Sequence, residues 1–196
     1  MKVEQLFTGC LAEMAYYIES NGEAAVIDPL RETEPYIRMA EANKAKIKYV
    51  FLTHFHADFV SGQYDLAQKT GAKIIFGPNA KADYEIYNGK DGEEFPLGKG
   101  KITLLHTPGH TMESSSYLIT DEKGNTPYVC TGDCLFIGDV GRPDLAVKSD
   151  LTQADLAGHL FDSLRNKIMT LPDDIIVYPN HGAGSACAIN MSSETF

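Results

Sequence analysis

The chain has 196 residues, and 43% of them are hydrophobic, which is enough for one domain with a substantial buried core. Its net charge of -10 argues against nucleic acid or an anionic membrane surface as a partner, because both require a basic patch. No apolar run is long enough to span a bilayer and Met1–Gln5 does not begin a signal peptide, so we expect a cytoplasmic protein.

The N-terminal third predicts an antiparallel meander followed by a helix. A tight turn at Asn21-Gly22 is expected between the second and third strands, and Pro35 suits the first turn of the helix. The predicted ranges are Val3–Phe7, Ala15–Ser20 and Glu23–Ile27 for the strands and Glu34–Ala42 for the helix.

Strands and helices alternate in the rest of the chain. Further helices are predicted at Phe59–Thr70, where Gly71 ends the pattern, and at Leu151–Leu164. The strands are predicted at Ile47–Leu52, Lys73–Phe76, Ile102–His106, Ser115–Thr120, Tyr128–Thr131 and Ile175–Tyr178. This mixture predicts a layered α/β (α+β) architecture in which helices cover one or two sheets.

We expect residues 1–196 to form a single domain. Ala186–Phe196 begins like a helix and stops without a cap, which leaves the end of a truncated chain and a frayed tail as alternatives. The cysteines Cys10, Cys130, Cys134 and Cys187 form no C-x-x-C pair, so free thiols are expected rather than a disulfide framework.

The segment Thr53–Phe59 holds three side chains of the types that bind metals, His54, His56 and Asp58, directly after the apolar run Tyr49–Leu52. Open α/β sheets place their ligands at the carboxyl ends of strands, so this segment is expected at such an end.

Three further residues follow apolar, strand-like runs in the same way. They are His110 after Thr107-Pro108-Gly109, Asp133 after Thr131-Gly132, and His181 after Pro179-Asn180. Imidazole and carboxylate groups brought to one rim by several strand ends are the components of a metal site. The sequence therefore predicts metal binding.

These motifs resemble the metallo-β-lactamase superfamily, whose H-x-H-x-D-H signature is matched by His54-x-His56-x-Asp58 with Phe59 in the last place. Within it the chain is most similar to the persulfide dioxygenase branch, in particular the bacterial type that is often fused to rhodanese domains. The segments that carry this resemblance are residues 53–62, 131–145 and 181–187. The resemblance implies an αββα sandwich.

The resemblance also implies one Fe(II) per chain, held by His54, His110 and Asp133, with zinc as a substitute. In the binuclear hydrolases of the superfamily a second zinc would use Asp58, the residue at position 59 and His181. A phenyl ring has no donor atom, so Phe59 weakens or abolishes that second site. His56, Asp58 and His181 are then expected to orient the ligands or to form a vestigial second site.

The expected activity is oxidation of a low-molecular-weight thiol persulfide by O2 to sulfite and thiol. The alternatives are a glyoxalase II-like zinc thioester hydrolase and a non-catalytic module that binds thiols or a partner. A rhodanese domain or protein is an expected partner, and a homodimer is compatible with the resemblance.

Three residues are candidates for contact with substrate. Arg142 would bind an anionic group, or else pair with Asp139 or Asp144. Tyr178 would hydrogen-bond the substrate, or else pack in the core. Cys187 would contact the substrate or accept a sulfur, or else be buried and inert. Two other histidines are expected to be structural, His106 in stabilising the loop that carries His110 and His159 as a solvated helix residue.

Overall fold

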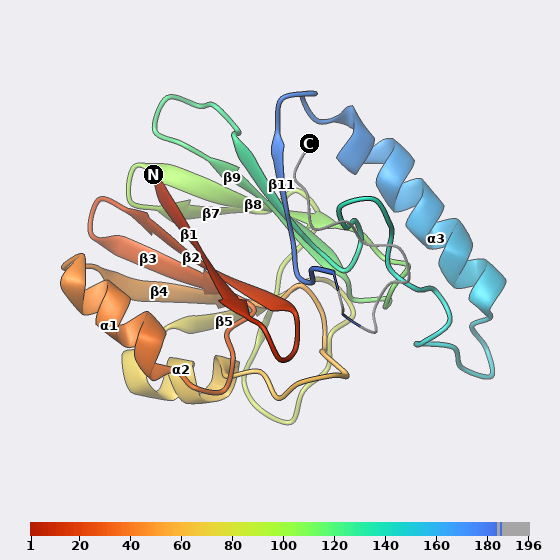
Figure 1. The fold of residues 1–196 in the computed structure, drawn as a ribbon, viewed down its shortest axis with the longest axis horizontal. Coiled ribbons are helices and arrows are strands. Elements are labelled where there is room, and N and C mark those ends of the chain that lie inside the picture. Colours follow the sequence, from red (N-terminus) through yellow and green to blue (C-terminus); the bar gives the residue numbers. More distant parts are fainter. Residues whose placement is uncertain (184, 186–196) are drawn as a thin grey trace.

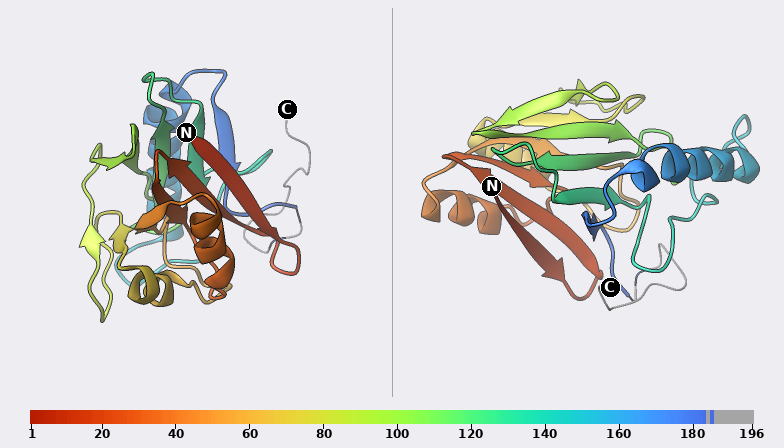
Figure 2. Two further views of the ribbon diagram at one scale, coloured as in Figure 1. Left: turned by 90° about the vertical axis from the view of Figure 1, so that its left-hand side faces the viewer. Right: turned by 90° about the horizontal axis from the view of Figure 1, so that it is seen from above.

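In a computed structural model of the chain, which describes residues 1–183 and 185, two sheets pack face to face with helices on their outer faces (Figures 1 and 2). The first sheet has the strand order β1-β2-β3-β4-β5-β6 and the second β11-β10-β9-β8-β7. Figure 2 shows α1 and α2 on one side of the pair and α3 on the other. The predicted αββα sandwich is confirmed.

The first sheet combines an antiparallel meander with parallel strand-helix units. Asn21 and Gly22, the predicted turn between β2 and β3, both have positive φ, 49° and 81°, as two-residue hairpins require. From β3 onward the pairing is parallel, with α1 and α2 as the crossovers. The elements are β1 (Lys2–Thr8), β2 (Glu13–Ser20), β3 (Glu23–Ile27), α1 (Glu34–Ala42), β4 (Lys46–Phe51), α2 (Gln63–Thr70), β5 (Lys73–Phe76) and β6 (Tyr87–Asn88).

The second sheet is antiparallel except at its edge, where β11 runs parallel to β10. The helix α3 connects these two strands and begins with a capping box formed by Thr152 and Asp155. The elements are β7 (Glu94–Leu97), β8 (Gly100–His106), β9 (Ser115–Thr120), β10 (Tyr128–Gly132), α3 (Gln153–Asn166), the short 3-10 helix η1 (Ile168–Thr170) and β11 (Ile176–Pro179).

Three apolar layers hold the sandwich together. The layer under α1 and α2 includes Tyr36 and Leu66, and the layer between the sheets includes Phe51 and Tyr117. The third layer packs α3 onto the second sheet through Leu160 and partners such as Val129. Because both faces of the sheet are covered here, β3 after Glu23 and the second half of β4 are continuously apolar rather than alternating.

The predicted helix at Phe59–Thr70 was wrong in its first turn, since α2 begins at Gln63. The preceding residues are tied to the end of β3 instead: the Gly62 amide donates to the Pro29 carbonyl at 2.8 Å. A Cβ on Gly62 would lie 2.1 Å from the Leu30 carbonyl oxygen, so a glycine is required where these backbones meet.

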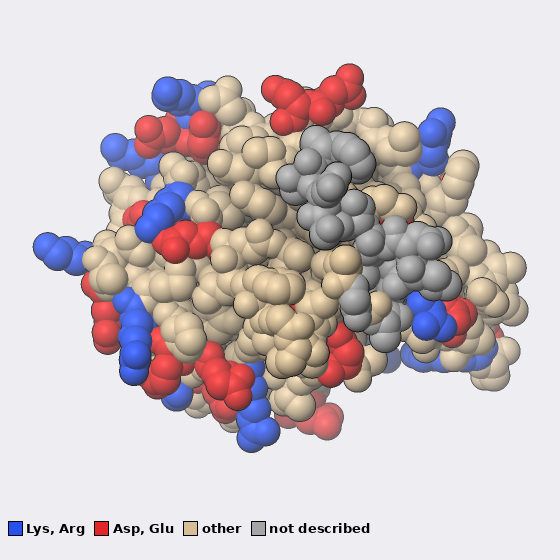
Figure 3. Space-filling model, viewed as in Figure 1, with Lys and Arg blue, Asp and Glu red and all other residues tan. Residues whose placement is uncertain are grey.

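The strands β6 and β7 were not predicted. The first has two residues, and the second contains Pro96, which weakens a strand pattern. No helix among the described residues is long and apolar enough to cross a membrane. On the face shown in Figure 3, basic and acidic side chains are interspersed and form no basic patch.

Candidate metal centre

The residues with metal-binding side chains come together where β4, β8, β10 and β11 end. His54 lies in the loop after β4, His110 in the loop after β8, and Asp133 directly after β10. His181 follows β11 in the same way. The strand ends therefore bring to one rim residues that are far apart in the sequence.

At the centre of this rim, one ligand atom from each of His54, His110 and Asp133 lies within 4.8 Å of the others, and all three residues are buried. The Asp133 Oδ2 atom is 3.8 Å from His54 Nε2 and 3.4 Å from His110 Nε2. That oxygen is buried and has no hydrogen-bond partner. A buried carboxylate oxygen rarely lacks a partner, and two imidazoles and a carboxylate are a fitting donor set for a metal ion.

Contacts on the outer side of the cluster fix how each imidazole is oriented. Thr53 Oγ1 donates to Asp28 Oδ2 at 2.8 Å, which leaves it to accept from His54 Nδ1 at 2.9 Å. The Arg142 carbonyl can only accept, so His110 Nδ1 donates to it at 3.1 Å. In both rings the lone pair is thus on Nε2, the atom that faces the cluster.

The protonation states of the cluster also suit a metal. Burial, followed by the neighbouring His56, lowers the pKa of His54 well below its usual value, so the ring stays neutral. Burial alone would raise the pKa of Asp133, but His54 and the hydrogen bond with His181 outweigh it and lower that pKa far below its usual range. Neutral imidazole and ionised carboxylate are the forms that bind metals.

The glycine at position 141 allows the loop after β10 to lie against the cluster. A Cβ there would be 1.8 Å from the Asp133 carbonyl oxygen and 3.2 Å from His110 Cβ. Any larger residue at Gly141 would therefore push the loop away and displace two of the candidate ligands.

The residues predicted to orient the ligands or to form a vestigial second site all have carboxylate or histidine partners. His181 lies between two carboxylates, with Nδ1 2.8 Å from Asp133 Oδ1 and Nε2 2.9 Å from Asp58 Oδ2. His56 Nε2 is 3.0 Å from Asp28 Oδ1, and the Phe59 ring packs on the His56 ring with centroids 4.3 Å apart. His56 thus bonds Asp28 through Nε2, while its Nδ1 atom is buried without a hydrogen-bond partner and its ring lies 4.3 Å from the His54 ring, centroid to centroid.

Sequence reasoning missed two acidic residues at this site. Asp28, directly after β3, accepts from the backbone amide and the hydroxyl of Thr53 at 2.8 Å each, and its position after an apolar run was the available signal. Glu13 at the start of β2 is fully buried and neither carboxylate oxygen has a partner. Its backbone forms an isolated antiparallel bridge with the backbone of His181. Burial, and after it the nearby charge of Asp28, raises the pKa of the Glu13 carboxyl to about 8. Nothing local in the sequence marks it.

The candidate substrate residues lie in different settings. Arg142 forms two hydrogen bonds to Asp144, at 3.0 and 2.7 Å, which is one of the pairings that the sequence left open. The Tyr178 ring stacks on Tyr128 with centroids 5.3 Å apart and also packs against Tyr16. Their roles toward a substrate stay predictions. Cys187 lies outside the described residues.

His106, His159 and Cys134 lie in structural or surface positions. His106 Nε2 is 2.9 Å from the Met112 carbonyl and so ties down the loop that carries His110, while His159 is exposed on α3. Cys134 is buried, and burial raises its pKa to about 12, so its thiol is not a nucleophile near neutral pH. The described cysteines form no disulfide.

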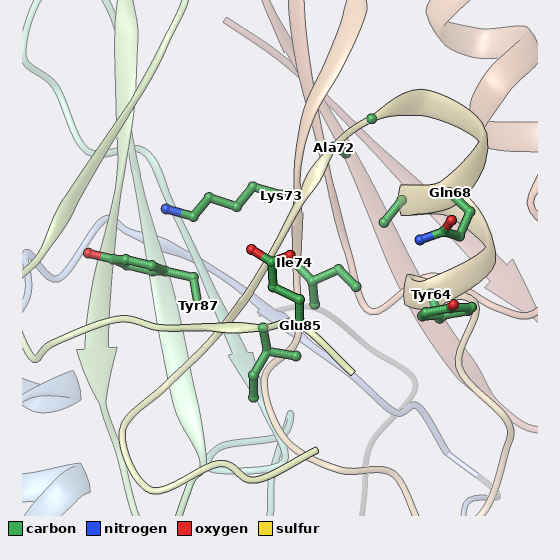
Figure 4. Close-up of a pocket in the computed structure, with 10 residues that line it drawn as sticks. Tyr64, Gln68, Ala72, Lys73, Ile74, Glu85 and Tyr87 are labelled. Carbon is green, nitrogen blue, oxygen red and sulfur yellow. The ribbon is translucent and has the colours of Figure 1, made fainter. Parts of the chain in front are cut away.

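A pocket of about 330 Å³ opens beside the cluster and is lined in part by His110. A larger pocket of about 510 Å³ lies elsewhere, between α2 and β5 (Figure 4). There Lys73 Nζ sits 3.5 Å from the centre of the Tyr87 ring. Only the first pocket reaches a candidate metal ligand, so it is the better candidate for a substrate site.

Comparison with known protein families gives a match for residues 8–181 to the model of the metallo-beta-lactamase superfamily. The chain belongs to this superfamily. The matched range contains every residue of the metal cluster, and the resemblance drawn from the motifs is confirmed at this level.

The individual relatives that the chain matches carry the names of different kinds of protein. The chain is 32% identical over 177 residues to a cytoplasmic hydroxyacylglutathione hydrolase of Arabidopsis thaliana, covering 88% of this chain and 65% of that protein. Among solved structures, a metallo-beta-lactamase of Staphylococcus aureus matches with a TM-score of 0.85 and 35% identity, over 94% of this chain and 57% of that one. ETHE1 of Myxococcus xanthus matches with a TM-score of 0.81 and 30% identity, over 95% and 78%. The chain thus spans less than two thirds of the first two relatives.

Proposed function

We propose that this protein is a mononuclear non-haem Fe(II) persulfide dioxygenase. The observation that supports this is the donor set: two imidazole Nε2 atoms and one carboxylate oxygen, from His54, His110 and Asp133, converge on one point. Two imidazoles and one carboxylate are the ligand set of iron enzymes that activate O2, because half of the iron's coordination positions stay open.

The residues at the second metal position also favour a single metal ion. A binuclear site would need a ligand at position 59, where this chain has Phe59. His181 and Asp58 are bonded to each other. A second ion would have to break this contact and would still lack one protein ligand.

In the proposed reaction a persulfide, O2 and water give thiol, sulfite and two protons. Iron, when bound, would supply open positions for the persulfide sulfur and O2 and the redox chemistry between them. The chain itself holds the ligands in register through Thr53, the Arg142 carbonyl and His181. The pocket beside His110 would hold the thiol carrier.

A zinc thioester hydrolase of the glyoxalase II type is the second candidate. The name of the Arabidopsis relative favours it, and the curated sequence comparison supports it better than the dioxygenase. It would use the same cluster to activate water. Phe59 weighs against the pair of zinc ions that such a hydrolase would use.

Metal analysis combined with two assays separates these functions. Iron in the purified protein and O2 uptake that depends on a persulfide would support the dioxygenase. Zinc with cleavage of an acylglutathione and no O2 uptake would replace it with the hydrolase. No turnover of either substrate after anaerobic loading with Fe(II) or Zn(II) would leave a thiol-binding or partner-binding module.

A further inference from the structure

The pocket beside His110 is formed by three loops. The loop after β4 contributes Phe55 and Ala57, and the loop after β8 contributes His110 to Glu113. The loop before α3 contributes Leu145, Ala146, Lys148 and Leu151. Phe55 and Leu145 are large apolar residues left 38% and 51% exposed. An open, partly apolar pocket that touches a metal ligand is suited to hold the part of a substrate that does not react.

Lys148 brings a positive charge to this pocket. Among the described residues that line it, Lys148 is the only lysine or arginine, and the structure gives its ammonium group no ion pair with any described residue. Arg142, the cation that the sequence pointed to, has its guanidinium hydrogen-bonded to both carboxylate oxygens of Asp144. In a chain with a net charge of -10, an anionic substrate depends on such a local cation.

The loop that carries Lys148 is fixed at both ends. The backbones of Lys148 and Leu151 exchange two hydrogen bonds, of 3.0 and 3.2 Å, and the next residue, Thr152, caps α3. At the other end of the loop the Arg142 carbonyl accepts from His110. The backbone that carries Lys148 is therefore fixed relative to the metal cluster, and its side chain is exposed.

The pocket also contains one acid, Glu113. Its Oε1 accepts from the Phe55 amide at 3.2 Å, so this carboxylate is engaged in holding two of the pocket's loops together. It would repel a second carboxylate beside it, which leaves the Lys148 side of the pocket as the place for a ligand's negative group.

We propose that this pocket binds a compact thiol carrier with a carboxylate group, and that Lys148 pairs with that carboxylate. The inference rests on the proposed function for the identity of the reacting group, but the anion contact itself does not depend on the reaction. A volume of about 330 Å³ is at the small end of ligand pockets, which favours a small carboxylated thiol over a large carrier with several phosphates.

The test compares two persulfides, those of 3-mercaptopropionate, which has a carboxylate, and of 2-mercaptoethanol, which has none. For wild type, Lys148→Met and Lys148→Arg, kcat/KM for O2 uptake is measured with each. We expect Lys148→Met to lower the preference for the carboxylated persulfide by about fivefold, as fits an ion pair at a partly exposed site, and Lys148→Arg to retain it. Lys123→Met, which removes an exposed lysine from the turn before β10, is the matched control.

Binding of the free thiols, followed by ligand-observed NMR, gives a readout independent of turnover. We expect 3-mercaptopropionate to bind more weakly to Lys148→Met than to wild type and 2-mercaptoethanol to show no such difference. Unchanged binding and an unchanged preference in Lys148→Met would overturn the inference. Lysine-dependent binding without O2 uptake by the wild type would instead overturn the proposed function and leave the anion site in place.

Discussion

The metal cluster and the neighbouring second position contain the same types of side chain, but only one of them is arranged to receive an ion. At the cluster, His54, His110 and Asp133 turn their ligand atoms toward one point, and one buried oxygen is left without a partner. At the second position, His181 is bonded to Asp58, and Phe59 stands where a further ligand would be needed. Residue type alone therefore does not make a site, because donors that satisfy one another have little to gain from a metal.

Removing a ligand from the cluster should have the largest effect. We expect Asp133→Ala and His110→Ala to lose bound metal and to lower the activity by at least roughly a hundredfold, because two protein donors hold an ion poorly. Metal content by mass spectrometry and O2 uptake are the measurements. His159→Ala, on the exposed side of α3, is the control. Full metal content in either cluster variant would refute the assignment.

Replacing His181 should damage both regions, since it links them. In His181→Ala, Asp133 and Asp58 lose the partner between them, and breaking a buried pair costs about 3–5 kcal/mol. Urea unfolding of the metal-free protein should show this loss. Metal affinity should fall by roughly 10–100-fold, because the carboxylate is no longer oriented. Wild-type affinity in this variant would show that Asp133 is held by other contacts.

The pH dependence of stability should show whether the buried Glu13 carboxyl, close to Asp28 and Asp58, destabilises the folded protein when it ionises. Its pKa is raised from 4.5 to about 8, so the folded state keeps a proton that the unfolded state has released. The free energy of unfolding of the metal-free protein should thus fall as pH rises between these values, by an amount on the order of a few kcal/mol. Glu13→Gln should lack this fall. Denaturant titrations at about pH 5, 7 and 9 cover the pH range in which this fall is expected. If Glu13 were not involved, the free energy of unfolding would change with pH in the same way in the wild type and in Glu13→Gln.

Restoring the missing ligand should have the smallest effect. Phe59→His supplies the donor that a second ion lacks, but His181 and Asp58 must first give up their hydrogen bond. We expect the metal content to rise above one ion per chain only with excess zinc, and Phe59→Leu to show no rise. A stable two-ion site formed without excess zinc would mean that residue 59 alone separates the two regions.

The sequence by itself determined the layered architecture and the central donors. Strand and helix patterns are local, and His54, His110 and Asp133 follow strand-like runs that each sit in a recognisable motif. The helix Glu34–Ala42 and the strand Ser115–Thr120 were predicted with the bounds that they have. Local patterns work here because burial on one or both faces of an element fixes its periodicity.

Only the tertiary structure decided which of these donors are free. His181 meets Asp133 across 48 residues and Asp58 across 123, and the Nε2 atom of His56 meets Asp28 across 28. The late start of α2 has the same origin, since residues 61 and 62 are held by the end of β3. Such contacts depend on how two sheets pack together, and a buried polar atom takes whichever partner that packing brings within reach.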